Sequence, residues 1–294
     1  MRKAFFPARR WARGRLLAVC AMAALVALVG AGQASAAAKK DNGIHYFGGP
    51  VMLGTVDVYY IWYGNWTGNT ATSLLPTLIG DLSGSSYMGI NTTYSSKVGA
   101  VSGQLNYAGE TTDNYSQGTA LSDAQVQSVV AQAINSGVLP KDSNGVYFVL
   151  ASQDVTETSG LDTQFCAFHQ HATIAGTDIK YAFVGNPARA PSSCEQQTSS
   201  SPNNNTGADG MANLIAWQLD DTTTDPDFNA WETSGKGKTP TGVENADLCK
   251  WTFGTTQTAS NGSLYNFAGA SGTQWLIQQN WVNASGGYCA LQYP

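Results

Sequence analysis

The sequence predicts a single domain of the mixed α/β (α+β) class, in which helices pack against one central, mostly apolar sheet. Three observations support this class. Residues 55–63 form a strand-like run that is apolar on both faces, the stretch after Ser122 has helical periodicity, and strands and helices are mixed along the chain. A strand buried on both faces needs a packed layer on each side of its sheet. A layout similar to that of metallopeptidases is a further expectation, raised by residues 207–249.

The first elements follow from residue type and spacing. β-branched and aromatic residues dominate positions 55–63, and successive side chains of a strand point to opposite faces. One face would carry Val56, Val58, Tyr60 and Trp62, and the other Tyr59, Ile61 and Tyr63. Residues 71–82 place leucines and an isoleucine at helical spacing, so we expect a helix there.

The clearest helix begins at Ser122. Ser122 and Gln125 have the spacing of a capping box, and Gly137 and Pro140 should end the helix. Its buried stripe would consist of Val126, Val129, Val130, Ala133 and Ile134. Two further strands are predicted, at residues 145–152 and 179–185.

The later part of the chain is less regular. Residues 192–205 are rich in Ser, Gln and Asn and predict a mobile loop. This loop leads into a helix that we expect Asp209 to cap, with Trp217 and Asp221 one turn apart on a shared face. Residues 273–282 are expected to form the last strand.

Residues 1–36 have the pattern of an export signal. Basic residues precede an uncharged, apolar run at 16–29, which ends at the small-residue site Ala34-Ser35-Ala36. Because that run is too short to span a bilayer, we expect a secreted protein without a membrane span, extracellular or periplasmic. The predicted organisation is a signal peptide at 1–36 and one extracellular domain at 37–294.

The charge of the chain excludes some partners. The signal holds six of the fifteen basic residues and none of the twenty acidic ones, so nine remain against twenty, a net charge of about −11. Such a surface is a poor partner for nucleic acid or anionic membranes.

Four cysteines remain after the signal: Cys166, Cys194, Cys249 and Cys289. An even number in an exported protein predicts two disulfides, for which the sequence permits three pairings. We favour Cys166 with Cys194 and Cys249 with Cys289, because each closes a loop worth about 3–4 kcal/mol in the chain-entropy model.

Residues 207–249 resemble the active-site helix of a metallohydrolase that lacks its metal-binding imidazole. A zinc hydrolase of the H-E-x-x-H type needs two ligands one turn apart and a carboxylate base beside the first. Trp217 and Gln218 occupy the ligand and base positions, whereas Asp221 keeps a carboxylate one turn later. An amide takes up no proton near neutral pH, so Gln218 cannot be a general base.

The candidate degenerate site comprises Trp217, Gln218, Asp221, Glu244 and Asp247. Trp217 could be a stacking platform for a ligand, but we favour a core residue. The three acids could converge on a hard cation such as calcium. We favour the alternative that they cap helix ends, bond to backbone amides or face solvent.

His169 and His171 are spaced to lie on one side of a strand, where they are weak candidates for two ligands of a metal ion, with Cys166 nearby. We favour structural or surface histidines, because a disulfide would remove Cys166 as a ligand. The sequence shows no G-x-S-x-G elbow, P-loop or dinucleotide fingerprint. A glycosidase would need a carboxyl pair, but spacing selects none among Asp220, Asp221, Glu232, Glu244 and Asp247.

Eight segments in the same order resemble the EXORDIUM, or phosphate-induced protein, family. They are residues 45–51, 55–66, 165–166, 181–186, 208–211, 229–231, 246–249, and 265–266 with the closing Cys289. The resemblance implies an exported protein, associated in plants with cell expansion and growth. Typical members read H-E-L-x-E where this chain has residues 217–221, so any chemistry of that His and Glu does not transfer. Residues 167–171 also depart from the family, so its disulfide set transfers only in part.

Together these observations predict a secreted EXORDIUM-like protein without catalytic turnover. We expect it to bind a cell-wall polymer, a glycan or an extracellular protein, and to need no cofactor. The alternative is a secreted hydrolase, either metal-dependent with a degenerate helix or carbohydrate-active, with a divalent cation such as calcium or zinc.

Overall fold

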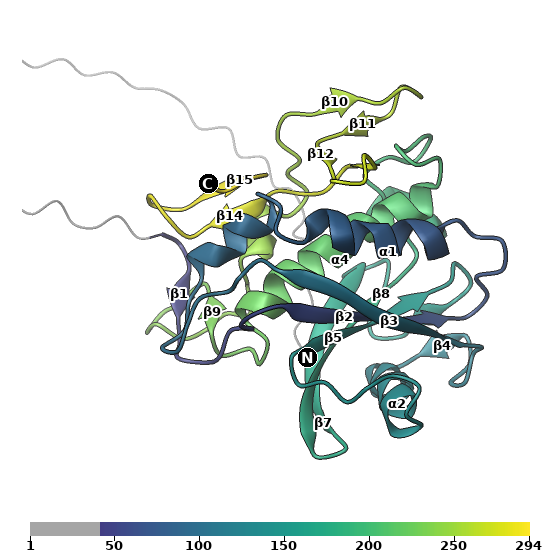
Figure 1. Ribbon diagram of the computed structural model, residues 1–294, viewed down its shortest axis with the longest axis horizontal. Coiled ribbons are helices and arrows are strands. Elements are labelled where there is room, and N and C mark those ends of the chain that lie inside the picture. The colour runs from purple at the N-terminus through teal and green to yellow at the C-terminus, as the bar shows by residue number, and fades with distance from the viewer. Residues whose placement is uncertain (1–41) are drawn as a thin grey trace, which may run out of the picture.

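A five-stranded sheet forms the centre of the protein (Figure 1), as seen in a computed structural model that describes residues 42–294. The expected export signal at 1–36 therefore lies outside the described residues. The strands follow the spatial order β3 (Leu105–Asp113), β2 (Val56–Tyr63), β5 (Gly145–Ala151), β8 (Thr177–Val184) and β7 (Ala167–Ile174). All neighbours pair in parallel except β7, which is antiparallel to β8. The mixed α/β class is confirmed.

Helices cover both faces of this sheet. Helices α1 (Ala71–Leu82) and α4 (Thr206–Thr224) lie on one face, and α2 (Asp123–Asn135) lies on the other (Figure 1). Successive side chains of β2 pack on opposite faces of the sheet, as expected. Tyr60 belongs to the core on the α1 and α4 side, and Ile61 belongs to the core on the α2 side. Burial of strand β2 from both sides accounts for its continuous apolar sequence.

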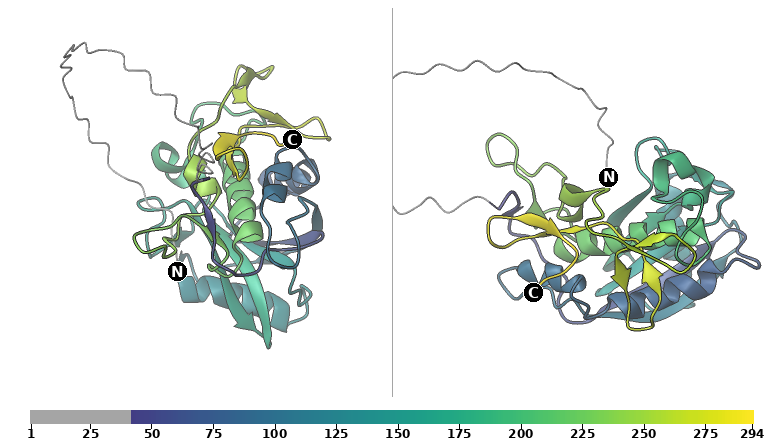
Figure 2. Two further views of the ribbon diagram at one scale, coloured as in Figure 1. Left: turned by 90° about the vertical axis from the view of Figure 1, so that its left-hand side faces the viewer. Right: turned by 90° about the horizontal axis from the view of Figure 1, so that it is seen from above.

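The remaining elements are short. They are β1 (His45–Tyr46), η1 (Met88–Thr93), β4 (Ala120–Leu121), β6 (Thr156–Glu157), η2 (Pro187–Arg189), α3 (Pro191–Cys194), β9 (Trp231–Glu232), η3 (Ala246–Cys249), β10 (Gln257–Thr258), β11 (Leu264–Tyr265), β12 (Phe267–Ala268), β13 (Gln274–Trp275), β14 (Asn280–Val282) and β15 (Tyr288–Ala290). Seen from above, the C-terminal segments lie across the layer that contains α1 and α4 (Figure 2). Helix α4 is therefore enclosed between the sheet and these segments.

Local sequence signals set the ends of α2 as predicted. The Ser122 hydroxyl accepts a hydrogen bond from the Gln125 backbone N–H, and the Gln125 side chain accepts from the Ser122 backbone N–H, which completes the capping box. The five residues of the expected stripe are buried. Helix α1 also has the predicted bounds.

The start of α4 differs from the prediction. Asn205 caps the helix by accepting a hydrogen bond from the Ala208 backbone N–H at 3.0 Å. Asp209 lies in the first turn, where it accepts hydrogen bonds from the backbone and side chain of Asn203. The prediction of Asp209 as the cap was wrong because Asn205, an equally good cap, comes earlier in the chain.

The expectation of a single last strand was also wrong. Residues 273–282 do not form one strand but contribute the separate strands β13 and β14, which belong to different two-stranded sheets. The loop at 192–205 begins with the short helix α3 and is held in place: Gln196 donates to the Asp209 and Leu276 carbonyls. Polar side chains of this loop thus bond to the rest of the domain, and its mobility stays a prediction.

Both expected disulfides are present. Cys166 is bonded to Cys194, and Cys249 is bonded to Cys289. The second bond ties η3 to the hairpin formed by β14 and β15. Among residues 42–294, no helix is long and apolar enough to cross a membrane.

Candidate functional site

The C-terminal half of α4 carries the most unusual chemistry of the described chain. A helix with this many polar residues normally exposes one face, but residues 207–224 of α4 are all buried. The neighbours of α4 include the central sheet, α1, η1, η2, η3 and β13. Polar side chains on this helix must therefore find partners inside the protein.

Asp221 of α4 lies close to Glu244, which comes just before η3, and to Asp247, which lies within η3. Each of these three residues, here called the acidic triad, offers one oxygen atom, and all three atoms lie within 4.8 Å of one another. Asp221 and Glu244 are buried, whereas Asp247 is partly exposed. The three acids thus converge. Facing solvent was only one part of the alternative that we favoured from the sequence.

Backbone amides fix two members of the acidic triad. The Ala246 N–H donates to Asp221 at 3.1 Å, and the Glu244 N–H donates to Asp247 at 3.3 Å. The second contact closes a turn over residues 244–247. These bonds agree with the expected pairing of the acids with backbone amides, and they hold the triad together.

Burial raises the pKa of the triad acids. The pKa of Asp221 lies well above its usual range because of burial, followed by the charges of Asp247 and Asp220. Burial also raises the pKa of Asp247, to about 6, while the Lys250 charge acts in the opposite direction. Near neutral pH the site therefore either holds protons or needs another positive charge.

Glu244 is the acid of the triad on which the most other acidic side chains act. Its pKa is raised well above the usual range by burial and then by four other acids, Asp221, Asp225, Asp247 and Glu232. On its other side, Nε2 of His169 lies 2.9 and 3.1 Å from the two carboxylate oxygens. His169 is itself buried on β7 and fixes the orientation of Glu244.

Asp220 serves a structural role beside the triad. Its carboxylate accepts hydrogen bonds from the Tyr87 hydroxyl at 2.7 Å and from the Asn91 amide at 2.9 Å. Burial raises its pKa to about 8. These bonds join α4 to η1. These bonds could not be predicted from local patterns, because the partners lie more than a hundred residues away in the chain.

Trp217 and Gln218 occupy the enclosed side of the same helix, 5% and 4% exposed. Trp217 is thus a core residue, in agreement with our interpretation, and no ligand can stack on it from solvent. Its Nε1 lacks a hydrogen bond of normal geometry, yet it faces Asp221 and Asp247 closely enough to lower the pKa of both. The Gln218 side-chain oxygen is also buried without a partner.

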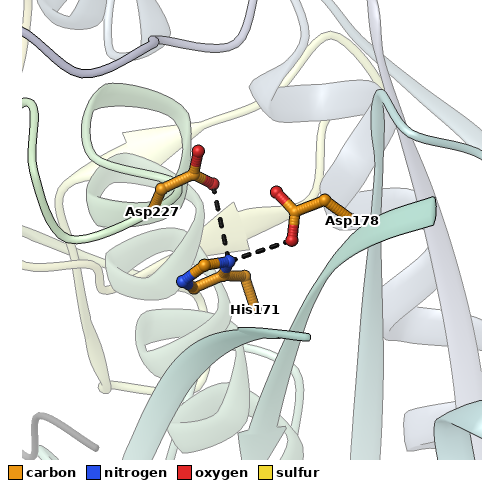
Figure 3. A group of neighbouring side chains, drawn as sticks. All are labelled: His171, Asp178 and Asp227. Carbon is orange, nitrogen blue, oxygen red and sulfur yellow. Dashed lines mark hydrogen bonds and ion pairs between the residues drawn. The ribbon is translucent and has the colours of Figure 1, made fainter. Parts of the chain in front are cut away.

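The second group of titratable side chains is formed by His171, Asp178 and Asp227, which point toward one another (Figure 3). Nδ1 of His171 lies 2.9 Å from Asp178 and 3.8 Å from Asp227. Lys180 completes the group, with Nζ 2.6 Å from Asp178 and 3.5 Å from Asp227. Because the ammonium already compensates the two acids, this group resembles a surface ion-pair network more than a metal site.

The structure does not bring His169 and His171 together at one point. The two side chains share a face of β7, as expected, but each contacts a different acid. The ring of Phe228 packs on both, with ring centres 4.6 Å from His169 and 5.9 Å from His171.

A pocket of about 240 Å³ lies between the edge strand β3 and helix α2. Hydroxyl and amide groups line much of it, including Thr111, Asn114, Gln132 and Ser136, and Asp113 is its one acidic residue. We did not predict β3, so the pocket was missed. The polar run at 111–116 could have indicated a strand end at a binding surface.

Fold and site define a disulfide-bonded α/β protein with one central five-stranded sheet and a buried acidic centre. The chain belongs to the family described as phosphate-induced protein 1 conserved region, whose sequence profile matches residues 44–291. It is 30% identical to Protein EXORDIUM-like 3 of Arabidopsis thaliana, covering 88% of each chain. It is 29% identical to Protein EXORDIUM-like 5 of the same plant, covering 82% of this chain and 76% of the relative. No solved structure matches significantly.

Proposed function

We propose that this protein is exported and binds a neutral glycan, such as a segment of a cell-wall polymer, without cleaving it. The observation that carries the non-catalytic part is the environment of Trp217 and Gln218. An indole and an amide stand where a metal ligand and a general base would be needed, and both are buried. The helix that resembles a hydrolase site therefore offers no proton acceptor at these two positions.

The pocket between β3 and α2 supports the binding part of the proposal. It lies beside the carboxyl end of a parallel strand, which is where open α/β sheets commonly bind ligands. Its hydroxyl and amide groups over an apolar floor of Ile61, Val129 and Ala133 suit a sugar, which presents hydroxyl groups and C–H faces. The acidic net charge disfavours an anionic polymer.

Export is supported by two findings. The two disulfides are typical of an oxidising compartment. The sequence before residue 37 has the composition of a signal peptide.

A glycan array with the mature protein tests the proposal. We expect binding to neutral oligosaccharides that Ser136→Trp, which fills the pocket, weakens at least about tenfold. Ser128→Trp is the matched control, because Ser128 is an exposed residue of the same helix outside the pocket. Equal binding by both variants would rule out the pocket, and release of shorter products from any bound glycan would overturn the non-catalytic part.

A further inference from the structure

We propose that the acidic triad of Asp221, Glu244 and Asp247 binds one divalent cation of the calcium class. The three oxygen atoms lie within 4.8 Å of one another. Calcium–oxygen bonds measure about 2.3–2.6 Å, so two oxygens on opposite sides of one ion are about 4.6–5.2 Å apart. Oxygens this close together can therefore contact one ion after small movements of the side chains.

An independent observation comes from Trp217. Its Nε1 is buried, lacks a hydrogen-bond partner of normal geometry and faces two triad acids. Carboxylates that bind metals are usually held by hydrogen bonds to their other oxygen. With an ion between the acids, the indole N–H is placed to donate to the oxygen of Asp221 or Asp247 that does not bind the ion. His169 already supplies the corresponding contact to Glu244.

Charge balance favours the same conclusion. Glu244 experiences the charges of four other acids. The basic neighbours of the triad include His169, which contacts Glu244, and Lys250, which acts on Asp247. The group of His171, Asp178 and Asp227 differs, because Lys180 lies in direct contact with both of its aspartates.

The ligand set indicates which ion binds. All three triad ligands are carboxylate oxygens, which suit a hard cation better than zinc, whose usual sites include nitrogen or sulfur. Magnesium demands shorter bonds, of about 2.0–2.1 Å, and near-ideal octahedral geometry. The partly exposed Asp247 gives the ion a path from solvent.

Isothermal titration of the chelator-treated mature protein with calcium chloride tests this inference, together with thermal unfolding at about pH 7.5. We expect one calcium ion per chain. At a free calcium concentration of about one hundred times Kd, the Tm should rise by roughly 5–10 °C. Magnesium and zinc, titrated in parallel, should bind more weakly.

Variants locate the ion. Asp221→Asn and Glu244→Gln should each weaken calcium binding at least about a hundredfold, because each removes one of three charged ligands. Asp178→Asn, in the group that contains Lys180, is the matched control and should keep the wild-type affinity. If Asp221→Asn or Glu244→Gln fails to fold, Asp247→Asn at the partly exposed position replaces it.

Two outcomes would overturn the inference. One is the absence of binding heat and of any Tm shift above about 1 °C with millimolar calcium, magnesium or zinc, since the weakest protein calcium sites have Kd near 10⁻³ M. The other is calcium binding that Asp178→Asn abolishes and Asp221→Asn leaves intact. Neither result depends on whether the protein binds a glycan.

Discussion

Nε2 of His169 lies within hydrogen-bond distance of both carboxylate oxygens of Glu244, and both side chains are buried. This contact joins the edge strand β7 to the segment before η3, which are 75 residues apart in the chain. The only acid of the triad that comes from neither a helix nor a 3₁₀ turn is thus oriented by the central sheet.

Replacing His169 should therefore destabilise the fold. His169→Phe keeps an aromatic ring against Phe228 but leaves Glu244 buried without its partner. We expect a loss of roughly 1–3 kcal/mol in the free energy of unfolding, measured by urea titration. His171→Phe is the control and should change stability by less than about 1 kcal/mol, because its ion pairs are partly exposed. Equal losses in the two variants would contradict this role.

Stability without divalent cations should fall as pH rises. The ordinary carboxyl pKa of 3.8 is raised by burial to about 8 at Asp220 and to about 6 at Asp247. Below about pH 4 the folded and unfolded states both hold these protons. At higher pH the unfolded chain loses them first, so the unfolded state gains stability until the folded-state pKa values are passed.

Urea unfolding in chelator at several pH values measures this trend. We expect the free energy of unfolding to be at least about 1 kcal/mol lower at pH 8 than at pH 5. Asp247→Asn should reduce the slope between pH 4 and 6, since it removes one of the raised groups. A stability that is flat or rises over this interval would show that these acids are ionised in the folded state.

Restoring an imidazole and a carboxylate on α4 should create a stronger metal site. Trp217 faces Asp221 and Asp247, so the variant Trp217→His with Gln218→Glu adds a nitrogen ligand beside two existing carboxylates. We expect zinc affinity to rise at least about tenfold in calorimetry. Trp217→Phe with Gln218→Glu controls for the lost indole and should show no such gain. An unchanged zinc affinity would mean that the helix lacks the geometry of a metal site.

Loss of the disulfide between Cys249 and Cys289 should weaken the fold substantially. This bond closes a loop with a sequence separation of 40 residues. Cys249→Ala with Cys289→Ala should lower the free energy of unfolding by about 4 kcal/mol in the chain-entropy model, measured by denaturant titration. A loss under about 1 kcal/mol would show that neighbouring contacts, such as the Gln278 side chain with the Ala246 carbonyl, hold this segment unaided.

Local patterns predicted the central layers well because their signals act within a few residues. The alternation of Tyr60 and Ile61 between two cores and the Ser122 capping box are examples. Predictions failed where two neighbouring residues could each play the same local role. Asn205, and not the predicted Asp209, is the N-cap of α4. Residues 273–282 have a strand-like sequence, yet they turn from one small sheet to another because their partners come from different parts of the chain.

The candidate site was only partly predictable. The acids of the triad could be named from the chain, but not their convergence, since Glu244 is placed by His169 and Asp221 by the Ala246 N–H. Those contacts join segments separated by 75 and 25 residues. Strand β3 and its pocket went unpredicted because alternate side chains of this edge strand are exposed, which makes its sequence mostly polar.

The bond between Cys249 and Cys289 also couples the buried acids to redox conditions. Glu244 and Asp247 lie within the same short segment as Cys249, so the covalent link restrains the backbone that carries them. A copy of this chain held where glutathione keeps thiols reduced would still have its sheet, whose pairing does not involve that link, but its carboxylates would be less firmly placed. Maturation of the acidic centre would then follow transport out of the cytoplasm.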